Sequence, residues 1–464
     1  MRRERHCSTS VTVLLSALPL TTLSGVCQAQ ETPAEEATIR ADETLAEAGG
    51  GPQDLPGRAK GDRSNEPEPE PEATEEDEEP ADWLHWETMT GDWSGARSSL
   101  EDAGFSFAGS FTQDWMAAWS GGLSGEAETV RLFDFNITAD LEKIAGIPGA
   151  TLFADYYIIS NGSVSALVGD YQGVSNIEAG DDIDQLAELW YEQWLCDRLL
   201  RLKVGKVDSN SEFGFVNAAG EFVNSSFAVT PTILTLPTYP DPAMSVNLFW
   251  YPTERCYVGL GWYDGAANDG VRTGARGPNT FFSDELSDDF FYVAEFGCTW
   301  ETLGSLPDGR FNVGVWHHDG DFPAFAGGTE DSTHGFYAAF EQCLWQPADL
   351  ADADDERGLR AFTAFGWGDE DVNPTHLHLA GGLALTGTFT GRDADSCGVG
   401  ITWVDLADDP GAGYPEDETT FEAFYVIEVS PWLQLKPDLQ YVVNPGGANV
   451  DDALVAGLRI EVSF

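Results

Sequence analysis

The last thirteen residues alternate between apolar and polar positions and end on an aromatic residue. One side of this segment carries Leu454, Ala456, Leu458, Ile460, Val462 and Phe464, and the other carries Val455, Gly457, Arg459, Glu461 and Ser463. A two-residue period belongs to a strand whose two faces meet different surroundings. An apolar face toward lipid and a charged face toward a watery lumen are typical of outer-membrane β-barrels. The segment therefore predicts a membrane-spanning strand.

The same alternation recurs in the strands before it. In 433–443 the polar face carries Gln434, Lys436, Asp438 and Gln440, and in 418–430 Glu422 and Glu428 oppose Phe421 and its apolar neighbours. An Arg or Lys that met lipid at the midplane would cost ~2–4 kcal/mol. We therefore expect the charged faces to line water.

Read along the chain, this period predicts about sixteen strands, an even number as an antiparallel barrel requires. They lie near 105–118, 129–141, 150–160, 184–195, 199–208, 243–252, 255–263, 288–301, 309–317, 333–346, 357–368, 376–388, 397–405, 418–430, 433–443 and 452–464. Tight turns such as 196–198 and 430–432 alternate with long connections such as 161–183 and 209–242. The fold class we predict is all-β, a transmembrane antiparallel β-barrel; a large soluble all-β protein is the alternative.

The N-terminal part of the sequence, up to residue 104, contributes three further predictions. Arg2, Arg3 and Arg5 followed by an apolar stretch indicate an export signal over 1–29. Residues 30–82 are rich in Glu and Pro and predict a disordered acidic linker. The barrel then occupies 83–464 and opens with a short helix over 92–104, which Asp92 or Ser94 caps and Gly104 ends.

Charge and cysteine content narrow the options. The net charge is -56, and residues 83–464 hold 60 acidic and 16 basic side chains, so a nucleic-acid partner is excluded on electrostatic grounds. Five cysteines follow the signal: Cys196, Cys256, Cys298, Cys343 and Cys397. All but Cys397 lie beside turns that we place at the periplasmic rim, where one or two bridges can form, although the pairing cannot be read from sequence. Their spacing predicts no metal site, and no cofactor is expected.

Several spaced motifs resemble those of carbohydrate-selective outer-membrane porins of the OprB type. They are Thr90–Leu100 (TGDWSGARSSL), Val174–Glu178, Glu188–Gln193, Leu202–Lys206, Phe222–Phe227 and Ser430–Gly447. Ser94 stands where that family commonly has a glycine. The resemblance implies a sixteen-stranded barrel in the bacterial outer membrane that lets sugars, often glucose-like, diffuse passively into the periplasm.

Candidate residues for a sugar-selective constriction come from groups that bond hydroxyls or pack against a pyranose ring. Glu188, Trp190 and Glu192 share one face of 184–195, opposite Ala187, Leu189 and Tyr191, and Arg201 and Lys203 share a face of the next strand. The alternatives are a solvated wall with cross-strand ion pairs, or a girdle position for Trp190.

Two further candidates lie outside these strands. Asn224 sits in a long loop that either folds inward or forms an ordinary surface turn. Arg97, in the entry helix, points either into the lumen or to the periplasmic rim.

The function predicted is a passive carbohydrate channel whose partners are permeating sugars and outer-membrane lipid. Association into a homotrimer stays open. A less selective, cation-preferring porin is the first alternative, because acidic rings attract cations. A barrel enzyme and a structural or adhesive barrel are the others.

Overall fold

The computed structural model describes residues 83–464 except 161, 282–288, 349–356 and 388. The predicted signal and acidic linker therefore lie outside the described residues. Of the two compact units of the chain, only Ala46–Phe464 contains described residues.

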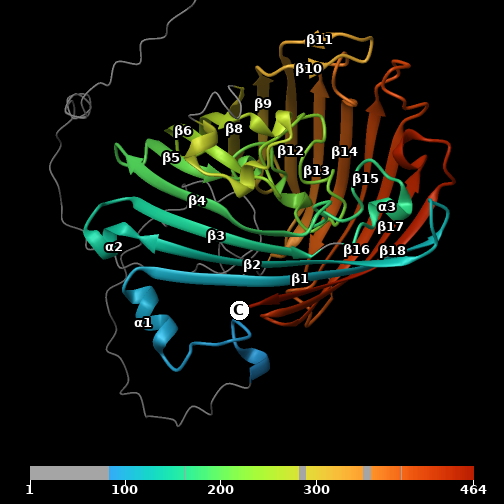
Figure 1. The fold of residues 1–464 in the computed structure, drawn as a ribbon. Helices are drawn as coiled ribbons and strands as arrows, with labels where there is room; N and C mark the ends of the chain where they lie inside the picture. Colours follow the sequence, from blue (N-terminus) through green and yellow to red (C-terminus); the bar gives the residue numbers. More distant parts are fainter. Residues whose placement is uncertain (1–82, 161, 282–288, 349–356, 388) are drawn as a thin grey trace, which may run out of the picture. The chain divides into compact units, whose positions relative to one another are not determined.

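Sixteen strands of the described chain form one closed antiparallel barrel (Figure 1). They are β1 (Phe105–Ser120), β2 (Ala127–Asp140), β3 (Ala150–Ser160), β4 (Ile183–Leu195), β5 (Leu200–Val207), β6 (Ala243–Thr253), β7 (Cys256–Asp264), β8 (Phe290–Trp300), β9 (Gly309–His318), β12 (Thr333–Trp345), β13 (Gly358–Gly368), β14 (Thr375–Thr386), β15 (Ser396–Leu406), β16 (Glu418–Ser430), β17 (Leu433–Val443) and β18 (Ala453–Ser463). The predicted fold class is confirmed. A small hairpin, β10 (Phe322–Pro323) with β11 (Thr329–Glu330), stands outside the barrel sheet.

The two ends of the sheet meet where β1 pairs with β18, from Ser110 opposite Ser463 to Ser120 opposite Leu454. The terminal Phe464 donates its main-chain N–H to the carbonyl of Gly109, and its ring stacks on Phe133. A Cβ on Gly109 would lie 2.7 Å from that ring. The glycine therefore makes room for the aromatic residue that closes the barrel.

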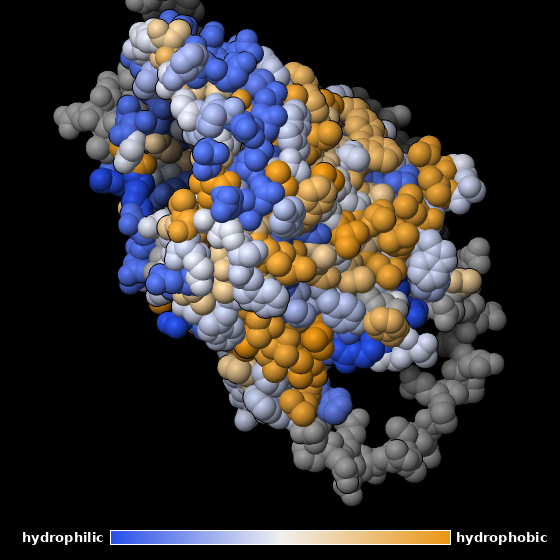
Figure 2. Space-filling view, turned by 90° about the vertical axis from the view of Figure 1, so that its right-hand side faces the viewer, coloured by the Kyte–Doolittle hydropathy of each residue, from blue (hydrophilic) through white to orange (hydrophobic). Residues whose placement is uncertain are grey.

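The predicted alternation holds across the sheet. On β17, Leu439 and Tyr441 are exposed outward, whereas Lys436 and Gln440 are buried inside. Apolar side chains gather over much of the outer surface in the view of Figure 2. No described helix is long and apolar enough to cross a membrane. Apolar side chains on the outward faces of the strands, such as Leu439 and Tyr441, form the surface that lipid requires.

Register shifts interrupt several strand pairs, most of them near strand ends, and the one in β4 changes the face of a predicted residue. The register of β3 and β4 passes from Asp155 opposite Glu188 to Tyr156 opposite Leu186, so Ala187 is an extra residue in β4. Ala187 is fully buried and packs in an inner cluster with Tyr157. The prediction that Ala187 faces outward was wrong, because a β-bulge puts two consecutive residues opposite one partner.

The entry helix is shorter than expected. The α1 helix covers Ala96–Asp102, because Trp93 and Ser94 adopt positive φ angles of 50° and 62° that a helix does not allow. The Asp92 carboxylate still accepts from the main-chain N–H of Ser98 at 2.8 Å. Gly104 follows the helix in the left-handed conformation, as predicted. A second helix, α2 (Leu141–Ala145), fills the turn between β2 and β3.

A disulfide joins Cys256 and Cys298, which lie directly opposite each other on β7 and β8. Both residues lie at the short-turn rim, as predicted. Cys343 and Cys397 belong to no disulfide in the described part of the chain.

Candidate functional site

Two long connections enter the barrel instead of standing above it. They are the β3–β4 loop (162–182), which contains α3 (Ser165–Val168), and the β5–β6 loop (208–242). In Figure 1 much of their chain runs inside the ring of strands. Asn224, in the second loop, is 1% exposed. Of the two alternatives left open for this loop, an inward path or a surface turn, the structure shows the inward path.

Apolar side chains on the inner face hold each loop. Phe222 of the β5–β6 loop meets Phe424 of β16 and Phe362 of β13 at ring-centroid distances of 4.9 and 5.4 Å. Val174 of the β3–β4 loop packs in a cluster with Val455 of β18. The inner face is therefore not uniformly polar, because its apolar side chains pack against the two loops.

Carboxylates on the inner face bind the main chain of the β5–β6 loop. The Glu422 side chain accepts from the amides of 223–224 at 2.6 and 3.0 Å. The Glu341 side chain accepts from the amides of 217–218 at 3.0 and 2.8 Å. The two N–H groups replace the hydrogen bonds that the buried carboxylate would otherwise make with water.

The β3–β4 loop is held in the same way. The Glu418 side chain, fully buried on β16, accepts from the amides of Tyr171 at 2.7 Å and Gln172 at 3.0 Å. It also accepts from the amide of Gly446, in the β17–β18 connection, at 2.5 Å. One carboxylate thus joins two connections to the barrel.

Four of the predicted site residues do come together. Arg201 lies 3.4 Å from the Glu192 carboxylate, Lys203 lies 3.8 Å from it, and the Lys203 ammonium is 3.9 Å from the ring centroid of Trp190. Both bases also pair with Glu212, a residue of the β5–β6 loop that the sequence did not single out. All these side chains are at most 8% exposed. The cluster therefore anchors the loop, and the loop covers it.

The other predicted residues lie elsewhere. The Glu188 carboxylate accepts from the amide of Asp208 at 2.9 Å, at the start of the β5–β6 loop. Asn224 donates through its side chain to Gln440 at 3.3 Å. Arg97 does not join them: it bonds Thr88 and the carbonyl of Phe107 beside α1.

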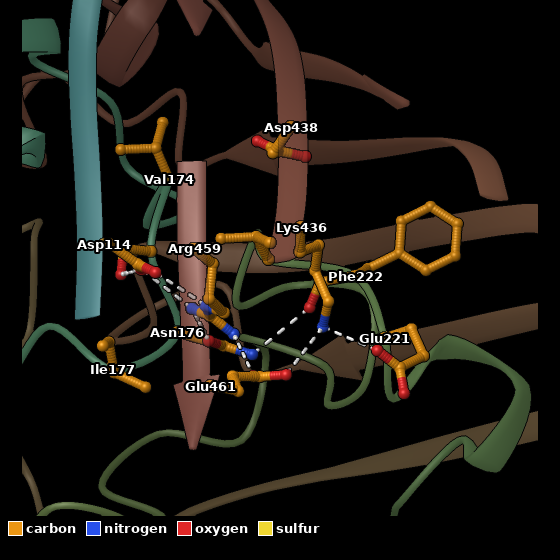
Figure 3. Close-up of polar contacts among 12 residues, drawn as sticks. Asp114, Val174, Asn176, Ile177, Glu221, Phe222, Lys436, Asp438, Arg459 and Glu461 are labelled. Atoms are coloured by element: carbon orange, nitrogen blue, oxygen red, sulfur yellow. Dashed lines mark hydrogen bonds and ion pairs between the residues drawn. The ribbon is translucent and has the colours of Figure 1, made fainter. Parts of the chain in front are cut away.

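A second charged cluster links both loops to β1, β17 and β18 (Figure 3). We call it the neck: Asp114, Asn176, Glu221, Lys436, Arg459 and Glu461. Arg459 makes two parallel bonds to Asp114, at 2.7 and 2.8 Å, and a third to the side-chain oxygen of Asn176 at 2.7 Å. Such a bidentate pair fixes both the orientation and the position of the Arg459 side chain.

Lys436 completes the neck. Its ammonium lies 2.6 Å from the Glu221 carboxylate of the β5–β6 loop and 3.8 Å from Glu461 of β18. Glu461 is also 3.8 Å from Arg459. The neck therefore bonds both inward loops to the strands: the β3–β4 loop through Asn176 and through Ser175, whose hydroxyl donates to Asp114 at 2.7 Å, and the β5–β6 loop through Glu221.

The charge pairs lower the pKa of two loop carboxylates. Burial alone would raise the pKa of Glu212, but the charges of Arg201 and Lys203 hold it below its ordinary value. The charge of Lys436 lowers the pKa of Glu221. Both loop carboxylates therefore stay ionised at pH values where an isolated glutamate begins to take up protons.

Comparison with known proteins shows which family this chain resembles. A family model described as "Carbohydrate-selective porin, OprB family" matches residues 125–464. Porin B of Pseudomonas aeruginosa is 24% identical over 430 residues, which cover 81% of this chain and 91% of that protein. The putative porin QuiX of Acinetobacter baylyi is 25% identical over 422 residues, which cover 81% of this chain and 93% of that protein.

A solved structure shares the fold. The high-pH structure of Pseudomonas putida OprB superposes with a TM-score of 0.72 at 23% sequence identity, over 82% of this chain and 99% of that one. Its low-pH structure superposes with a TM-score of 0.53 at 19% identity over the same shares.

Proposed function

The chain belongs to the OprB family of carbohydrate-selective porins, and we propose that glucose-like sugars cross its barrel past the neck. It is a channel of the bacterial outer membrane, and its fold and family are those of a channel rather than an enzyme. Passage is passive diffusion, so that selectivity comes from the width of the lumen and the groups that line it.

The observation that supports this proposal is the filling of the lumen. A sixteen-stranded barrel of this kind encloses an aqueous channel unless something narrows it. Here two loops enter and bind to inner-face carboxylates, and a polar cluster remains where both loops approach β18. Carboxylate and amide groups at a narrow point exchange hydrogen bonds with the hydroxyls of a passing sugar.

In this proposal the cluster around Arg201 has an indirect role. Glu192, Trp190, Arg201 and Lys203 are buried under Glu212, and they set the position of the β5–β6 loop rather than touch the solute. The width at the neck then depends on these residues, because the same loop carries Glu221.

Liposome swelling across a series of sugars tests the proposal. We expect wild-type vesicles to swell in hexoses and much less in larger oligosaccharides. Glu188→Ala with Arg201→Ala should release the loop, raise conductance and flatten the dependence on sugar size. Exposed Glu254→Ala serves as the control. Unchanged discrimination in the double variant would argue against this role for the cluster.

A less selective, cation-preferring channel is the second candidate. The 60 acidic against 16 basic residues of 83–464 favour it. Sugar that fails to reduce the ion current at millimolar concentration would support this candidate over a sugar-selective channel.

The partners follow from the outer surface. We propose that outer-membrane lipid covers the exposed apolar residues of the strands, such as Leu189 and Val315. A homotrimer stays a prediction, which crosslinking in native membranes would measure.

A further inference from the structure

The charged residues of the neck differ in how far they reach the open lumen. The side chains of Lys436 and Arg459 are 3% and 5% exposed, whereas those of Glu221 and Glu461 are 50% and 27% exposed. In Figure 3 Glu221 and Glu461 lie at the ends of the contacts that Lys436 makes. A solute that reaches the neck therefore meets carboxylates, and the basic groups stand behind them.

Negative charge also outnumbers positive charge at this point. Three carboxylates of the neck, those of Asp114, Glu221 and Glu461, pair with the two bases, and Asp438 of β17 lies near them in Figure 3. Asp438 is 5% exposed, and one of its oxygens receives no hydrogen bond from the described residues. The positive charges of Lys436 and Arg459 therefore leave an excess of negative charge.

The rim that carries the long loops is also negatively charged. Acidic pairs or triplets occupy the β13–β14, β15–β16 and β17–β18 connections, at 369–371, 408–409, 416–417 and 451–452. A mouth of one sign raises the local concentration of solutes of the opposite sign. The rim and the neck therefore act in the same direction on a charged solute.

We propose, building on the proposed function, that the channel prefers protonated amino sugars to neutral hexoses and excludes sugar acids. The ammonium of a 2-amino hexose would bind on the lumen side of Glu221 and Glu461, whose carboxylates lie 2.6 and 3.8 Å from the Lys436 ammonium behind them. An ammonium adds the attraction of opposite charges to its hydrogen bond with a carboxylate, whereas a hydroxyl supplies the hydrogen bond alone. A sugar carboxylate at the same place meets two half-open carboxylates and no exposed base.

The test compares three pyranoses of similar size. Purified full-length protein in phosphatidylcholine vesicles is given radiolabelled glucosamine, glucose or glucuronate at about pH 6, where the amine and the acid are both charged. We expect glucosamine to enter about tenfold faster than glucuronate, with glucose between them. High salt should reduce the difference, because it screens exposed charges.

Variants assign the preference to the neck. Glu221→Gln with Glu461→Gln should bring the ratio of glucosamine to glucose entry close to one. Glu461→Gln alone, on a barrel strand, should lower the ratio without removing the loop contact of Lys436. The control Glu254→Gln with Glu301→Gln removes two exposed carboxylates of the β6–β7 and β8–β9 connections and should keep the ratio.

The outcomes separate the two claims. Vesicles that take up none of the three solutes overturn the proposed function, and the preference falls with it. Glucose entry without faster glucosamine entry overturns the preference alone, as does a glucosamine preference that survives in both neck variants.

Discussion

The Asp114–Arg459 pair shows how a charge is kept inside this barrel. The two side chains are 1% and 5% exposed, and the guanidinium bonds the carboxylate at 2.7 and 2.8 Å. Removing both charges of a buried pair costs little, whereas removing one leaves the other without a partner. Asp114 is the direct reason why an arginine can stand at this position in β18.

A double-mutant cycle on this pair tests that statement. Arg459→Gln should destabilise the folded barrel by about 3–5 kcal/mol, because Asp114 stays buried and charged. Asp114→Asn with Arg459→Gln should recover most of that loss. Urea unfolding in detergent, followed by the gel mobility of the folded barrel, measures both. A double variant as unstable as Arg459→Gln alone would contradict the argument.

Sequence predicted the strand partners of the buried cluster but not their loop partner. The two-residue period puts Arg201 and Lys203 on one face, and the structure agrees. Glu212 gives no periodic signal, because it lies in a loop whose path depends on distant wall residues. The same reason hides the neck from sequence: alternation predicts that Lys436, Arg459 and Glu461 face the lumen. It does not predict that Glu221 and Asn176 reach them from two different loops.

At the scale of elements, each strand could be predicted and the loops could not. Alternation sets the strand and its faces, since a one-residue slip would turn charges toward lipid. Bulges are not visible in this pattern, and the one at Ala187 in β4 is an example. Loop paths depend on hydrogen bonds such as those from 223–224 to Glu422, across a sequence separation that no local pattern covers.

The β5–β6 loop should respond to pH through two of its acids. The pKa values of Glu212 and Glu221 are lowered by basic neighbours. A lowered pKa contributes stability that is present above the unfolded value, about 4.3, and is lost as pH falls through the folded value. We expect single-channel currents to stay steady down to about pH 4 and to become noisy below it.

Variants distinguish this from general acid damage. Lys436→Met removes the base that lowers the pKa of Glu221, so noise should begin at a higher pH. The control Arg255→Met removes an exposed base whose partner, Glu301, lies at the periplasmic rim, and should leave the onset unchanged. Equal onset in all three proteins would contradict the assignment.

For the whole molecule, the charge balance predicts the ion preference. The excess of acids over bases in 83–464 and the acidic rim attract cations before any solute reaches the neck. Reversal potentials across a KCl gradient should show K⁺ favoured over Cl⁻. The preference should shrink from 0.1 to 1 M salt, as the Debye length falls from about 10 to about 3 Å. A preference for Cl⁻ would contradict this view of the channel.

The carboxylates of Glu341, Glu418 and Glu422 accept hydrogen bonds from main-chain N–H groups of the loops. Every amino acid except proline supplies the same N–H group. Side chains of the loops that point into the open lumen can therefore be exchanged while the loop keeps its place. The barrel can therefore keep its structure while the lumen-facing side chains of the loops change, which allows its solute selectivity to be altered by substitution in these loops.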